Sequence, residues 1–68
     1  MSDDQLVEWL TRIEAEYREM PGLHLTARQM QRLWGLDARA CADVVAILVV
    51  RGVLCERPQR GFGLVRTM

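Results

Sequence analysis

The chain has 68 residues, of which 50% are hydrophobic and 26% charged, and its formal net charge is zero. This length and balance are typical of one small folded domain spanning residues 1–68, and they exclude a second domain or a long disordered tract. Because the longest purely apolar stretch, residues 44–50, is too short to cross a bilayer and the acidic start does not resemble a signal peptide, we expect a cytoplasmic protein without a membrane partner.

The charges are segregated along the chain. Residues 1–20 carry six acidic and two basic side chains, a balance of −4 (2 − 6). Residues 21–68 carry seven arginines and three acidic side chains, a balance of +4 (7 − 3). Such segregation lets an anion approach one part of the surface while the other repels it, although a chance distribution of charges would give the same count.

A first helix is predicted over residues 2–20. Ser2 and Gln5 have the spacing of a capping box, in which each side chain bonds the backbone amide of the other residue. Pro21 and Gly22 end the helix. Apolar residues recur between these ends at spacings of three and four, which predicts one buried stripe of Leu6, Trp9, Leu10, Ile13, Tyr17 and Met20.

A short connector and a second helix over residues 26–34 follow. Leu23–Leu25 is predicted to be extended, with a short third strand there and His24 exposed to solvent. Thr26 and Gln29 form a second capping box. The inward side of the helix is predicted to carry Ala27, Met30, Leu33 and Trp34, and its outward side Arg28, Gln31 and Arg32.

A third helix over residues 37–51 is predicted to begin after a tight elbow, with Gly35 left-handed, Leu36 filling the turn and Asp37 as the N-cap. Five β-branched residues between Val44 and Val50 would equally suit a strand, but the caps and the spacing favour a helix that ends at Gly52. Its buried stripe is predicted to comprise Cys41, Val44, Val45, Leu48 and Val49.

A two-stranded hairpin over residues 53–66 completes the predicted fold, with strands at 53–57 and 62–66 and the turn dihedrals supplied by Pro58 and Gly61. The sequence therefore predicts an α+β domain, mostly α, of three helices and a C-terminal hairpin.

Nothing in the sequence indicates catalysis, a metal or a cofactor. Cys41 and Cys55 belong to no CxxC motif and are predicted to be reduced apolar fillers, with His24 as the only histidine. There is no glycine-rich phosphate loop, and Ser2 is the only serine. We therefore expect a protein that is not an enzyme and carries no cofactor.

The run from Thr26 to Arg66 resembles the winged helix-turn-helix family of small prokaryotic regulators. The resemblance rests on Thr26 with Gln29, the elbow from Trp34 to Asp37, the exit of the third helix through Gly52, and the hairpin with its arginines. With the first helix it covers nearly the whole chain. It implies a fold used by repressors, adaptors and protein scaffolds alike.

The resemblance implies that the third helix reads base edges in double-stranded DNA while the second helix and the hairpin hold phosphates. Carried over by position, the base-contacting residues are Ala38, Arg39, Ala42 and Asp43, followed by Ala46. The backbone-contacting residues are Thr26, Arg28, Arg32, Arg57, Gln59 and Arg60. Arg39 suits guanine, whereas Asp43 repels phosphates unless it accepts a bond from cytosine N4.

Two other interpretations stay open. The small apolar residues of the third helix suit a helix that packs against another protein, unless the hairpin and first helix cover them within the monomer. The arginines are equally typical of a solvated face, and Phe62 is a candidate for stacking on a single-stranded base. A homodimer is expected if DNA is bound, and its candidate surfaces are the first helix, with Val7 and Trp9, and residues 65–68. Together with Val7 and Trp9, the residues of a possible protein interface are Ala46, Ile47 and Val50 of the third helix.

Overall fold

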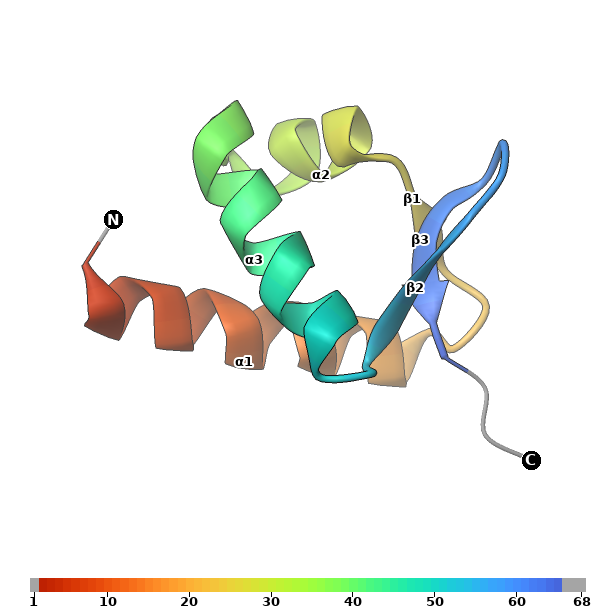
Figure 1. Cartoon of the computed structure of the whole chain (residues 1–68), viewed down its shortest axis with the longest axis horizontal. Helices are drawn as coiled ribbons and strands as arrows, with labels where there is room; N and C mark the ends of the chain where they lie inside the picture. Colours follow the sequence, from red (N-terminus) through yellow and green to blue (C-terminus); the bar gives the residue numbers. More distant parts are fainter. Residues whose placement is uncertain (1, 66–68) are drawn as a thin grey trace.

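The computed structural model describes residues 2–65. In chain order the elements are α1 (Asp3–Glu19), β1 (His24–Leu25), α2 (Ala27–Trp34), α3 (Ala38–Val50), β2 (Leu54–Arg57) and β3 (Gly61–Leu64) (Figure 1). The predicted class of a mostly helical α+β domain is confirmed, as are the third strand and the helix bounds to within one residue at each end. The part of the predicted hairpin at residue 66 lies outside the described residues. Among the described helices, none is long and apolar enough to cross a membrane.

Both predicted capping boxes are present, which explains where α1 and α2 begin. The Ser2 hydroxyl accepts a bond from the Gln5 amide at 3.3 Å, and the Thr26 hydroxyl accepts one from the Gln29 amide at 3.1 Å. Each glutamine side chain in turn accepts a bond from the backbone amide of its cap residue. These bonds satisfy amides that a helix start otherwise leaves without partners.

The elbow between α2 and α3 also forms as predicted. Gly35 is left-handed with φ 65°, a conformation that glycine adopts without steric cost. Leu36 is buried behind it, and the Asp37 carboxylate accepts a bond of 2.7 Å from the Ala40 amide. This cap starts α3 in a fixed direction relative to α2, so the β-branched stretch continues as a helix rather than as a strand.

The core lies where the three helices meet β2. Its buried residues are Leu10, Ile13, Tyr17, Met30, Trp34, Leu36, Cys41, Val44, Val45, Leu48 and Leu54. Three residues predicted to be inward are exposed instead: Leu33 (59%), Val49 (40%) and Met20 (56%). Ala27 is exposed as well. The stripe on α2 is narrower than its sequence suggests, because Met30 and Trp34, one turn apart, already fill the contact with α3, while Met20 lies beyond the last turn of α1.

The three strands form an antiparallel sheet in the order β1-β3-β2. His24 and Cys55 are both opposite Gly63, and Arg57 is opposite Gly61. The hairpin turn differs from the prediction, since Gln59 takes a positive φ of 68° together with Gly61 at 93°. A bond of 3.2 Å from the Arg60 amide to the Arg57 carbonyl oxygen closes this turn. Proline in second place and a positive φ in third are the features of a type II turn.

Candidate nucleic-acid interface

The four residues predicted to contact bases are all exposed on the first two turns of α3, but they lie on two sides of that helix. Arg39 and Asp43, one turn apart, line a hollow toward the start of α1. Ala38 and Ala42, also one turn apart, line a groove toward the hairpin. The structure therefore divides the predicted base contacts into a charged stripe and a small apolar stripe.

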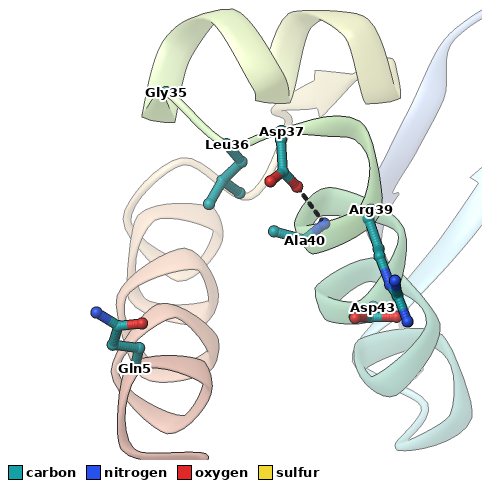
Figure 2. A pocket seen from close by; sticks show the side chains of 7 residues that line it. All are labelled: Gln5, Gly35, Leu36, Asp37, Arg39, Ala40 and Asp43. Carbon is teal, nitrogen blue, oxygen red and sulfur yellow. Dashed lines mark hydrogen bonds between the residues drawn. The ribbon is translucent and has the colours of Figure 1, made fainter. Parts of the chain in front are cut away.

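The hollow beside the charged stripe has a volume of about 500 Å³ and lies between the start of α1 and the elbow (Figure 2). The Arg39 side chain runs along α3 toward Asp43, and the Asp37 carboxylate is directed at the Ala40 amide (Figure 2). Across residues 2–65, the only ion pair within 4.0 Å joins Arg18 to Glu14 on α1. The guanidinium of Arg39 is therefore available to a ligand.

The groove on the other side of α3 has a volume of about 470 Å³ and is almost entirely apolar. Phe62 of β3 and Ala27 of α2 form its far wall. Its α3 wall comprises Ala38, Cys41, Ala42, Val45, Ala46, Val49 and Val50. The sequence signal for this groove was the recurrence of alanine and valine at every fourth position of α3, but the contribution of Phe62 depends on how the hairpin packs.

The predicted phosphate-contacting residues of α2 are exposed, as expected for that role. Arg28 and Arg32 lie one turn apart on the outward side of the helix. The Thr26 hydroxyl oxygen accepts the Gln29 amide, so its hydrogen is still available to donate to a phosphate oxygen. All three side chains are thus exposed donors on α2 or at its N-cap.

The hairpin arginines lie on a separate surface. Arg57 and Arg60 line a polar hollow of about 210 Å³ with His24, Pro21 and Leu64, whereas neither lines the two hollows beside α3. Gln59 is exposed at the turn between them. His24, predicted to be exposed, is partly buried and its Nδ1 lies 2.9 Å from the Gly22 carbonyl oxygen. No binding role was predicted for this histidine, and the signal for its packing is Gly63 on the strand beside it, where a side chain would collide with the imidazole ring.

The five residues predicted as a protein interface do not form one surface. Val7 is 60% exposed on α1, but Trp9 is partly buried, packs against the core and lies under the Arg12 guanidinium at 5.1 Å. Ile47 is also partly buried against the core. Val50 is 86% exposed, so the monomer covers Ile47 but not Val50. Ala46 is also exposed, and it lines the same groove as Val50. Of the candidate dimer surface at the C-terminus, residues 66–68 lie outside the described residues.

The two cysteines differ in exposure. Cys41 is buried, with its sulfur 3.6 Å from the Ala27 carbonyl oxygen and 4.0 Å from the Met30 sulfur, and burial raises the pKa of its thiol. Cys55 is partly exposed on β2. In the described part of the chain, no three histidine, cysteine or acidic side chains cluster in a way that could hold a metal ion.

Most of the acidic residues are on α1, whereas Asp37 and Asp43 line the hollow with Arg39 and Glu56 is on β2. Six acidic residues are on α1, and Figure 1 shows α3 between this helix and α2. Exposed arginines lie on α2, on α3 and in the hairpin.

Comparison of the chain with models of protein families, with curated proteins and with solved structures found no match.

Proposed function

We propose that this chain is a winged helix-turn-helix protein, without enzymatic activity, that binds double-stranded DNA as a transcriptional regulator. The supporting observation is the exposed arginines of α2, α3 and the hairpin, none of which forms an ion pair within residues 2–65, while six of the nine acidic residues are on α1. A polyanion is attracted to the elements that carry these arginines and repelled by α1.

In this proposal α3 enters the major groove. Arg39 donates two bonds to O6 and N7 of guanine, and Asp43, one turn later on the same stripe, accepts a bond from cytosine N4. The stripe of Ala38 and Ala42 beside them lets the helix approach the base edges closely and suits contact with thymine methyl groups. The preferred site therefore contains G·C pairs under the charged stripe.

Backbone phosphates are held on both sides of that helix. Thr26, Arg28 and Arg32 donate from α2, while Arg57, Gln59 and Arg60 donate from the hairpin. If four to six arginines meet phosphates, the slope of log affinity against log salt is about −4 to −5. One copy then binds weakly at physiological salt, so we expect a homodimer on paired half-sites.

The test is the duplex affinity of arginine variants, measured by fluorescence anisotropy on a sequence selected from a random pool and on an unrelated duplex. Arg39→Ala should lose about 10-fold or more on the selected duplex and little on the other. Arg60→Ala should weaken both alike and flatten the salt slope by about one unit. Arg18→Ala is the matched control, because Arg18 is paired with Glu14 on α1. Equal losses on both duplexes for Arg39→Ala would contradict its role as a base reader.

The groove between α3 and Phe62 favours a second candidate function, a module that binds another protein. Val50 is 86% exposed there, and an exposed apolar groove suits an apolar helix of a partner. Val50→Glu places a charge in the groove at the last residue of α3, away from the predicted base contacts and without changing an arginine. If the DNA proposal is correct, this variant still binds the duplex with a salt-dependent affinity, which is reduced only by the repulsion of the one added charge. If the chain is a protein-binding module, the variant loses its protein partner, and neither the variant nor the native protein binds the duplex.

A further inference from the structure

The outer face of the sheet carries a hollow in which three nitrogen-bearing side chains meet. Side chains directly opposite one another on paired strands point to the same face, and successive ones alternate. Leu54 is buried against the helices, so Cys55 and Arg57 point away from them, as does His24 across Gly63. Glu56 alternates to the other face. The hollow of about 210 Å³ is thus lined by His24, Arg57 and Arg60 with no carboxylate.

The imidazole of His24 is held in one position. Its Nδ1 lies 2.9 Å from the Gly22 carbonyl oxygen, and because a carbonyl only accepts, Nδ1 carries the hydrogen and Nε2 is the nitrogen left for a ligand. The ring lies on the backbone of Gly63, where a Cβ atom would come within 2.6 Å of the ring carbon Cδ2 and 2.7 Å of Nε2. Glycine at position 63 therefore makes the space that the ring occupies.

The two arginines are positioned by the turn between them. The bond from the Arg60 amide to the Arg57 carbonyl oxygen sets the separation of their backbones. Gly61 anchors this turn against β1, because a side chain at Gly61 would collide with the carbonyl group of Leu25. The hollow is therefore lined by an imidazole that is bonded to the backbone and by two arginines on a short closed turn.

We infer that this hollow binds a phosphate group. Guanidinium groups donate paired bonds to phosphate oxygens, and Nε2 of His24 adds one more bond, either accepting from a phosphate hydroxyl or, when protonated, donating to an oxygen. The hollow is open to solvent, and its volume of about 210 Å³ is large enough for a phosphate group. Arg57 and Arg60 are also the hairpin residues that the proposed function assigns to duplex phosphates, so for a nucleic-acid phosphate the inference rests on that function and deepens it at the hairpin. The contribution of His24 does not depend on base reading by Arg39.

The test is a titration of labelled protein with inorganic phosphate, followed through the His24 ring and the Arg57 and Arg60 guanidinium signals by NMR. We expect saturating shifts at these three residues, absent with sodium chloride at equal ionic strength. Arg57→Gln and Arg60→Gln should each weaken binding about 5-fold or more, and His24→Asn, whose amide can still bond the Gly22 carbonyl, about 3-fold. Gly63→Ala, which displaces the ring, should match His24→Asn.

Arg51→Gln is the matched control, because it removes one positive charge from an exposed arginine at the end of α3, outside the hollow and outside the predicted DNA contacts, and should leave phosphate binding unchanged. Shifts that do not saturate, or that equal those in chloride, would overturn the inference, as would a loss in Arg51→Gln as large as in Arg57→Gln. If Gly63→Ala fails to fold, the other variants still decide. Titration with a duplex then identifies the source of the phosphate. If the His24 signals and the Arg39 amide signal shift together on addition of duplex, the phosphate belongs to nucleic acid. If the His24 signals respond to free phosphate alone, the phosphate belongs to a small ligand.

Discussion

The hydroxyl of Tyr17 donates a hydrogen bond of 2.8 Å to the carbonyl oxygen of Phe62, joining two residues that are 45 positions apart. Tyr17 is 0% exposed in the last turns of α1, and Phe62 is in the middle of β3. This bond fixes the hairpin against the helices, and with it the position of the Phe62 ring in the groove beside α3. Burial raises the pKa of Tyr17 to about 12.

Tyr17→Phe should lower the free energy of unfolding by about 1 to 3 kcal/mol, because it removes the donor and leaves the Phe62 carbonyl oxygen without that partner. Urea denaturation followed by circular dichroism measures this loss. Because the ring itself is retained, packing at the core should change little. A loss below the error of the measurement would show that the bond does not hold the hairpin in solution.

The same tyrosine predicts a loss of stability in alkali. Its pKa is raised in the folded state, so its contribution is fully present below pH 10 and is lost as the pH rises from about 10 toward 12. Tyr17 is the only tyrosine in the chain, so its ionisation can be followed at 295 nm without overlap. Urea midpoints of the native protein and of Tyr17→Phe, measured from pH 9 to 11, should converge as the pH increases. Parallel curves would contradict the raised pKa.

Gln59→Gly should raise the free energy of unfolding by about 0.5 to 1 kcal/mol, because a side chain at positive φ is strained and glycine is not. Gln59 is the only residue other than glycine with a positive φ in the described chain. Thermal unfolding compares this variant with Gln59→Val, which should destabilise the turn because β-branched residues tolerate positive φ least. A destabilised glycine variant would mean that the turn in solution differs from that described.

The two thiols should react at very different rates. Cys41 is buried and its thiol pKa is raised by burial, whereas Cys55 is partly exposed on the sheet. A disulfide reagent at pH 8 should modify Cys55 rapidly and Cys41 only as fast as the domain opens. Mass spectrometry of the Cys55→Ser variant measures the slow rate by itself. Rapid modification of Cys41 in that variant would contradict its place in the core.

The helices could be predicted from the sequence because their ends depend on local chemistry. The capping boxes at Ser2 and Thr26 and the left-handed Gly35 act within a few residues, and each is where the spacing put it. Exposure was less predictable. Leu33 and Val49 have the right spacing for an apolar stripe and are exposed, because whether another element covers such a residue depends on how wide each helix contact is.

The candidate sites are formed by residues that are far apart in the sequence. Which of these residues lie together depends on how the strands pair and the helices pack, so the sequence alone did not predict the sites. That Arg57 and Arg60 share a hollow with His24 follows from the register of β1 with β3, which no local pattern encodes. The hairpin turn also places Gln59 at a positive φ, whereas Pro58 and Gly61 alone were expected to supply the turn dihedrals. The groove required Phe62 to face α3, which the bond from Tyr17 stabilises.

The most direct test of duplex binding is amide chemical-shift mapping on labelled protein titrated with a mixed-sequence duplex at low and at moderate salt. The proposal predicts shifts at residues 26–32, 38–43 and 59–61 that become smaller as the salt concentration rises. Absence of shifts at low salt, or shifts confined to the acidic surface of α1, would contradict it and leave the groove between α3 and Phe62 as the functional surface.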